Sequence, residues 1–447
     1  MQLNQTDGKD NSVQLKLSAA VFSVLSAAQG YAVADPTDVV DSALMHYQER
    51  DGRVATTEVV VHARETLSDD STSGISLTFD TLSGGSPNGA LPSKTVQTFA
   101  RPSGHSLSSS ANPGVQTYTT ASGQIVTSGS GPSVPYTIAP GALPIDSSFH
   151  DQRIAANLDW STPIAPLTTA SWGANFSHEL DFASLSANAT VAHDFNEKNT
   201  NLSAGVNLEY DEIRPIGGAP VPMSDYALFK KTGNQNKQVA DLLLGISQVM
   251  TRRWLTELNL SLDNSNGYQN DPYKIVSALD AAGNTVGYVF ENRPRNRSRN
   301  SLYWGNKFAL DHDTIDLSLR YMTDNWGIKS ETAELRYRWA LSDKSYFEPQ
   351  FRYYRQDAAN FFRFYLMQGD PLVPYASADP RLAAFDATTL GIRWATQINR
   401  SSEFSVRLES YQQTGKGPAV VPPGLQGLNL YPGLKAQLIE VGLKIQF

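Results

Sequence analysis

From residue 42 onward, large apolar residues alternate with polar residues along nearly every regular stretch of the chain. A period of two predicts β-strands that have one apolar face and one polar face. The pattern predicts sixteen strands, at residues 42–49, 53–65, 73–82, 149–162, 167–180, 183–194, 199–212, 237–251, 254–266, 298–311, 314–324, 329–341, 345–356, 384–398, 402–412 and 436–447. Many exceed the five or six residues usual in soluble proteins and reach the roughly 9–11 that a tilted membrane-crossing strand needs. The sequence therefore predicts an all-β fold, a transmembrane antiparallel up-and-down β-barrel.

The connections between these strands differ in length. The long ones are residues 83–148, 213–236, 267–297, 357–383 and 413–435, and each follows an odd-numbered strand. Because outer-membrane barrels have short periplasmic turns and long outer loops, we expect these five segments on the outer side. The first is rich in Ser, Gly and Pro, which leaves two interpretations: a mobile solvent-facing loop, or a loop that folds in and narrows the mouth.

The charged positions predict which face lines the lumen. In the stretch ELRYRWAL, Glu334, Arg336 and Arg338 share one face, opposite Leu335 and Trp339. An arginine that faces lipid at mid-depth costs about 2–4 kcal/mol, so the charged face must line the lumen. The same parity predicts the following lumen-lining residues: Arg320, Arg336, Arg338, Arg352, Arg393, Arg407, Glu334, Glu348, Glu409, Asp159, Glu179, Glu209, Glu257 and Asp263.

These lumen positions are unevenly charged. The arginines fall on the later strands, and the acids and amides fall mainly on the earlier ones. Two interpretations stay open. Opposed walls would set a transverse field across a porin-like channel, for which sixteen strands leave room. Alternatively, the charges would form a salt-bridged network that fills the barrel.

The N-terminal region predicts export. Residues 17–28 read LSAAVFSVLSAA, an apolar segment too short to cross a bilayer as a helix, with small residues at Ala32 and Ala34 behind it. We expect a signal peptide at residues 1–34, a short periplasmic segment at 35–41 and the barrel at 42–447. The predicted location is the bacterial outer membrane, reached by export through the inner membrane.

Composition argues against several functions. A net charge of −8 without a dominant basic patch disfavours nucleic-acid binding. The seven histidines form no HxH or HExxH pair, and no phosphate-binding or dinucleotide fingerprint occurs. We therefore expect no catalytic residue, cofactor or metal, and no enzymatic activity. The competing hypotheses are an outer-membrane enzyme with carboxylates such as Glu209 and Asp263 at the lumen mouth, and a soluble periplasmic β-protein.

Several long motifs resemble one family. They are ALMHYQERDGRVATTEVVV, SPNGALPSKTVQTF, DFNEKNTNLSAGV, NDPYKIVS, ENRPRNRSRNSLYW, RYMTDNWGIKSETAELRYRW, FRYYRQDAANFF and YASADPRLAAFDATTLG. Across nearly all of residues 42–447 the chain resembles proteobacterial proteins known only as a domain of unknown function. The resemblance implies an outer-membrane β-barrel whose gene often lies near genes for an FMN transferase, a thioredoxin-like protein and a small lipoprotein. It thereby implies an exported redox or metal-handling system with a periplasmic or lipoprotein partner, and it transfers no catalytic residue.

The last predicted strand carries a further signal. Val441, Leu443, Ile445 and Phe447 share its apolar face, so it resembles the sorting signal that the barrel-assembly machinery reads. We expect this strand to pair with the first strand, because an open sheet edge is not tolerated in lipid. The expected partners are therefore outer-membrane lipid and the assembly machinery.

Overall fold

The computed structural model describes residues 38–67, 69–102, 117–119, 125–127, 133–228, 230–371 and 373–447. The predicted signal peptide at residues 1–34 lies outside the described residues, as do residues 35–37 of the short segment that follows it. In the part of the chain that is described, no helix is long and apolar enough to cross a membrane.

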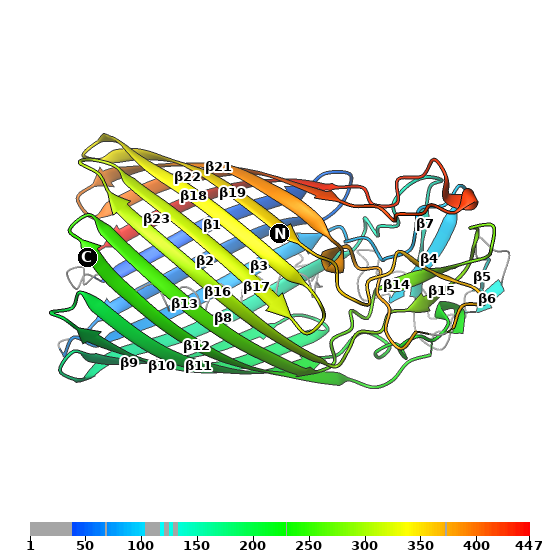
Figure 1. Cartoon of the computed structure of the whole chain (residues 1–447), viewed down its shortest axis with the longest axis horizontal. Helices are drawn as coiled ribbons and strands as arrows, with labels where there is room; N and C mark the ends of the chain where they lie inside the picture. Colours follow the sequence, from blue (N-terminus) through cyan, green and yellow to red (C-terminus); the bar gives the residue numbers. More distant parts are fainter. Residues whose placement is uncertain are drawn as a thin grey trace, which may run out of the picture.

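Sixteen antiparallel strands form a closed barrel (Figure 1). In order around the barrel they are β1 (Val39–Glu49), β2 (Ala55–Thr66), β3 (Thr72–Ser83), β8 (His150–Ala165), β9 (Thr168–His178), β10 (Phe182–Phe195), β11 (Thr200–Ile213), β12 (Gln235–Thr251), β13 (Trp254–Gly267), β16 (Asn296–Ala309), β17 (Thr314–Asp324), β18 (Lys329–Ser342), β19 (Ser345–Gln356), β21 (Phe385–Asn399), β22 (Ser402–Gly415) and β23 (Leu434–Gln446). The predicted fold class is confirmed.

The barrel closes where β23 pairs with β1. Val441 lies opposite Leu44, and Ile445 lies opposite Val40. Strand β1 begins at Val39, earlier than the predicted residue 42, because Val39 still has partners on both neighbouring strands. No edge strand is left, so the backbone polar groups of the sheet are satisfied without water.

The outer face of the barrel is apolar. At least half of the surface of Leu44, Leu77, Leu158, Leu208 and Trp339 is exposed. Exposed apolar side chains at every second position of neighbouring strands form a lipid-facing belt. This polarity rules out the soluble β-protein, whose apolar face would be buried.

The five long connections fold together at one end of the barrel (Figure 1). We call their described residues, within 84–149, 214–234, 268–295, 357–384 and 416–433, the cap. The cap contains a two-stranded sheet of β4 (Gln97–Pro102) and β7 (Ser133–Ile138), a pair of β5 (Thr117–Thr119) and β6 (Ile125–Thr127), and a three-stranded sheet of β14 (Ile275–Leu279), β15 (Thr285–Phe290) and β20 (Tyr365–Met367). Its three short 3-10 helices are η2 (Tyr226–Leu228), η3 (Pro380–Leu382) and η4 (Pro423–Leu425).

The cap has hydrophobic cores of its own. Phe99 of β4 and Ile138 of β7 pack with Ile275 and Phe290 from another connection. A second cluster joins four connections through Leu91, Leu279, Leu425 and Leu430 together with Tyr365. The mobile-loop interpretation is therefore wrong for residues 84–102 and 133–149, which are part of a folded unit.

Candidate functional site: the lumen cavity and its cap

A cavity of about 760 Å³ lies inside the barrel. Lumen-facing residues from β2 to β19 line it, and so do Tyr268, Asp271, Arg293 and Arg381 of the cap. The cap therefore forms part of the cavity wall, through the connections at 268–295 and 357–384; the first long connection, which in one interpretation narrows the mouth, supplies none of the described residues that line the cavity. The lumen is not completely filled by side chains.

The structure divides the predicted lumen residues into two groups. Asp159, Glu209, Asp263, Arg320 and Arg352 line the cavity. The others on the strands occupy the same inward parity elsewhere along the barrel: Glu257, Glu334, Arg336, Arg338, Glu348, Arg393, Arg407 and Glu409. Glu179 lies just beyond the end of β9 and is buried.

Several of the inward charges on the later strands are paired with neighbours. Arg336 forms an ion pair with Glu334 at 2.5 Å, and Arg407 lies 3.9 Å from both Glu409 and Glu440. Arg338 instead stacks on the ring of Tyr346, 3.6 Å from its centroid. The later strands thus carry a local charge network, as the filled-barrel interpretation requires, beside the open cavity.

A polar row crosses the cavity wall on the earlier strands. Asn207 lies opposite Asp241, which lies opposite Asp263, which lies opposite Arg299. Asn207 Nδ2 donates to Asp241 Oδ2 at 3.0 Å, and Arg299 forms an ion pair with Asp263. Asp241, Arg297 and Arg299 were not among the predicted lumen residues. Arg297 fell in the predicted loop at 267–297, whereas Asp241 and Arg299 lie within the predicted strands 237–251 and 298–311 and were overlooked.

The predicted separation of charge is also incomplete, because arginines lie on the earlier strands as well. Arg153 lies on β8 among the earlier strands and binds Asp80 at 2.5 Å and Glu58 at 3.1 Å. These three residues form a compact buried group rather than one half of a transverse field. The field across the lumen is therefore weaker than a strict division of the two walls would give.

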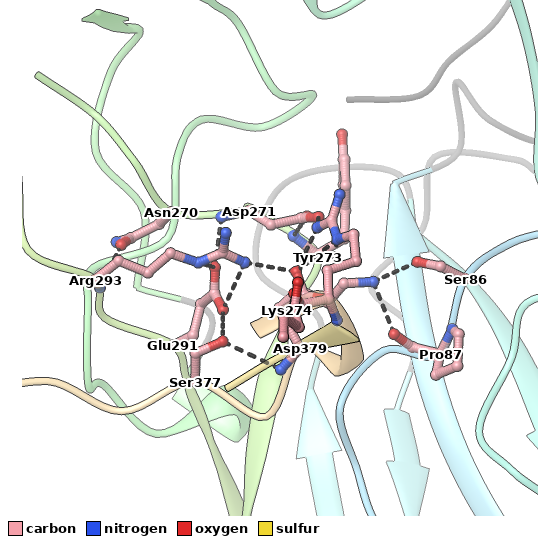
Figure 2. Close-up of polar contacts among 12 residues, drawn as sticks. Ser86, Pro87, Asn270, Asp271, Tyr273, Lys274, Glu291, Arg293, Ser377 and Asp379 are labelled. Atoms are coloured by element: carbon pink, nitrogen blue, oxygen red, sulfur yellow. Dashed lines mark hydrogen bonds and ion pairs between the residues drawn. The ribbon is translucent and has the colours of Figure 1, made fainter. Parts of the chain in front are cut away.

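An ionic cluster inside the cap holds two connections together (Figure 2). The guanidinium of Arg293 lies 2.7 Å from Glu291 Oε1 and 2.8 Å from Asp379 Oδ2. Ser377 donates its hydroxyl hydrogen to Glu291 Oε2 at 2.5 Å. Glu291 and Asp379 are almost completely buried, so each depends on these partners for its charge.

The cluster extends to further residues. Arg381 binds both carboxylate oxygens of Asp379 and reaches Asp271 Oδ2 at 2.9 Å. Lys274 donates to the carbonyl of Pro87 at 2.7 Å and to the hydroxyl of Ser86, both in the first long connection (Figure 2). Three connections are thus joined by buried polar contacts.

The charges of the cluster balance. Its acids are Asp271, Glu291 and Asp379, and its bases are Lys274, Arg293 and Arg381.

Burial and charge pairing together set the pKa values of the cluster. Burial alone would raise the pKa of the Asp379 carboxyl, but Arg381 and Arg293 outweigh it and hold that pKa below its usual range. Burial raises the pKa of Glu291, although Arg293 opposes the shift, and burial lowers the pKa of Lys274. Asp379 is therefore the carboxylate on which the cluster depends.

The cluster was not predicted from the sequence because its members are far apart in the chain. Loop residues do not follow the alternation of apolar and polar positions that identifies strands. A pair such as Arg293 and Asp379 forms only because two connections pack against each other. One signal was present: these charges lie within the motifs NDPYKIVS, ENRPRNRSRNSLYW and YASADPRLAAFDATTLG that carry the family resemblance.

The cavity and cap do not present a metal site in the described residues, where no group of three or more His, Cys, Asp or Glu side chains could hold an ion. The two carboxylates of the enzyme hypothesis, Glu209 and Asp263, line the same cavity, but Asp263 forms an ion pair with Arg299.

The fold and the lumen define an outer-membrane-type β-barrel. The chain belongs to the family described as "Protein of unknown function (DUF3570)", whose model matches residues 14–445. No curated protein matches the chain.

Several solved structures share the barrel fold. The ferric enterobactin receptor PfeA of Pseudomonas aeruginosa is 8% identical with a TM-score of 0.41, and the match covers 85% of this chain and 54% of the receptor. This chain thus spans about half the length of that receptor. A bacterial polysaccharide outer membrane secretin is 7% identical with a TM-score of 0.44, and the match covers 93% of this chain and 100% of the secretin. OccK2 of P. aeruginosa is 10% identical with a TM-score of 0.38, and the match covers 92% of this chain and 98% of OccK2. These similarities concern the fold alone.

Proposed function

We propose that this protein is an outer-membrane channel for small polar solutes and that the cap covers its outer mouth. The observation that carries the proposal is the cavity of about 760 Å³, which is lined by polar strand residues and bounded by the cap. A filled structural barrel would not need such a space. Passage of a solute requires no catalytic residue, and we assign none.

The cap gives the channel a controlled entrance. Its hydrophobic cores and its ionic cluster hold the five connections together over one end of the lumen. Long loops of outer-membrane barrels face outward, so this end is the extracellular mouth. The membrane-platform alternative is supported by the family resemblance alone.

Osmotic swelling of liposomes tests this proposal. Purified protein is reconstituted beside a variant in which Gly85 is joined to Asp146, two positions that already lie next to each other. We expect slow entry of small sugars with the complete protein and faster entry with the shortened cap. If neither protein admits solute although both show heat-modifiable mobility, the channel proposal is wrong.

A further inference from the structure

Three cavity arginines, Arg64, Arg320 and Arg352, form no ion pair with a residue that the structure describes, and two of them, Arg320 and Arg352, lie on strands close together. Arg153, Arg297 and Arg299 line the cavity, and each forms an ion pair with a neighbouring carboxylate. Arg320 and Arg352 line the same cavity, and neither forms an ion pair with any residue that the structure describes. Buried or half-buried cations are normally paired, so this exception calls for a counter-ion.

The two arginines lie close to each other on the lumen face. Arg320 is on β17 and Arg352 on β19, and the single strand β18 separates them, a spacing of about 10 Å. In the register, Arg320 lies opposite Thr332, which lies opposite Tyr354, two residues from Arg352. The positive charge of Arg352 and the negative charge of Glu334 both act on Arg320, with opposite effects.

The nearest acid does not neutralise them. Glu334 lies opposite Arg352 in the register, but its carboxylate is 2.5 Å from Arg336. Arg320 rests on the ring of Tyr303, 5.5 Å from the centroid, which orients the guanidinium without supplying a negative charge. Neither guanidinium group forms an ion pair with a described residue and both line the cavity, so their donors are available to a ligand there.

We propose that Arg320 and Arg352 form an anion-binding site in the lumen that selects small hydroxylated solutes with one carboxylate or phosphate group. Guanidinium groups bind such oxyanions through charge-assisted hydrogen bonds. The amides of Asn157, Asn188 and Asn207 line the same cavity and offer donors and acceptors for hydroxyl groups. The inference rests on the proposed channel, since it names the class of solute that the channel would pass.

Equilibrium binding to the intact, detergent-solubilised protein tests the site by calorimetry. Gluconate, sorbitol and N-methylglucamine are probes with similar polyol chains but negative, zero and positive charge. We expect gluconate to bind about ten- to a hundredfold more tightly than the other two, because each hydrogen bond between a guanidinium group and the carboxylate adds to the binding free energy. Glucose 6-phosphate distinguishes a phosphate preference from a carboxylate preference.

Matched variants assign the effect to the two residues. The double variant R320Q/R352Q should reduce gluconate affinity to the level of sorbitol, whereas R352K should retain part of it. R355Q is the control, because Arg355 is exposed on the same strand with the opposite parity. Heat-modifiable mobility establishes that each variant is folded.

Equal affinity of the wild-type protein for gluconate and sorbitol would refute the proposed anion-binding site. Unchanged gluconate affinity in the folded double variant R320Q/R352Q would also refute it. The calorimetry does not require conduction. Failure of solute entry in liposomes would therefore remove the channel proposal, while the binding result would still decide whether the anion site exists.

Discussion

Arg293 and Asp379, which are 86 residues apart in the sequence, form a buried ion pair of 2.8 Å between two connections. Their side chains are 10% and 1% exposed. Removing one partner of such a pair leaves a buried charge without compensation, which costs about 3–5 kcal/mol. This pair therefore helps to decide whether residues 268–295 and 357–384 move as one body.

The variant Asp379→Asn should loosen the cap without unfolding the barrel. It removes the charge that binds both Arg293 and Arg381, so we expect amide hydrogens of residues 268–295 and 357–384 to exchange much faster, while those of the barrel strands stay protected. Hydrogen exchange followed by mass spectrometry measures this.

A surface pair provides the matched control. Asp311 lies 2.7 Å from Arg253, and both side chains are largely exposed. Exposed pairs contribute about 0–1 kcal/mol, so Asp311→Asn should leave exchange unchanged. Equal effects of the two substitutions, or protection of the cap in Asp379→Asn, would refute the role given to the cluster.

Acid should loosen the cap below about pH 4. Because the pKa of Asp379 is lowered in the folded cap, its stabilising contribution is complete above the unfolded pKa of about 3.9 and is lost as the pH falls further. Glu291 acts with the opposite sign, since its raised pKa makes protonation favour the folded cap as the pH falls toward 4.

We therefore expect channel opening to decrease slightly or stay constant between pH 7 and pH 4 and to increase below it. Recording open probability against pH in planar bilayers measures the profile. Asp379→Asn should lose the increase below pH 4; a variant that keeps it would show that another group is responsible.

Position 415 should be intolerant of a larger side chain. A Cβ atom at Gly415 would lie 1.5 Å from the ring of Tyr431, whose hydroxyl donates to the carbonyl of Pro380 at 3.1 Å. We expect Gly415→Ala to displace this ring and destabilise the cap by about 1–3 kcal/mol, as overpacking does. Gly417→Ala is the control, because its Cβ would meet nothing within 4 Å. Protease digestion of the cap compares the two, and equal resistance would contradict the account.

A charge on the lipid face should impair assembly. Leu158 is 55% exposed in the outer belt, whereas its neighbour Asn157 lines the cavity. Leu158→Arg should cost about 2–4 kcal/mol in the bilayer, whereas Asn157→Arg should be tolerated. Urea unfolding in vesicles, read by heat-modifiable mobility, compares them; equal loss in both would mean that the two faces are assigned wrongly.

The barrel could be predicted from the sequence because each strand repeats the same local rule. Apolar and polar residues alternate whether or not the partner strand is known, so Leu335 and Arg336 reveal their faces from their own positions. Several strand boundaries differ from the prediction by two or three residues, and at β16 this difference hid Arg297.

The cap could not be predicted in this way. Contacts such as Lys274 with Pro87, or Phe99 with Tyr288, join distant segments and leave no periodic pattern in the sequence. Trp326 shows the same limit: it is buried against Phe361 of the cap, and nothing in its local sequence indicates that contact.

Single-channel recording of the wild-type protein and the Asp379→Asn variant in planar bilayers shows whether the cap closes a channel. We expect brief or rare openings for the wild type and longer or more frequent openings for the variant, because the cap covers the lumen and Asp379 holds it together. Folded barrels of both proteins that remain electrically silent would contradict this expectation.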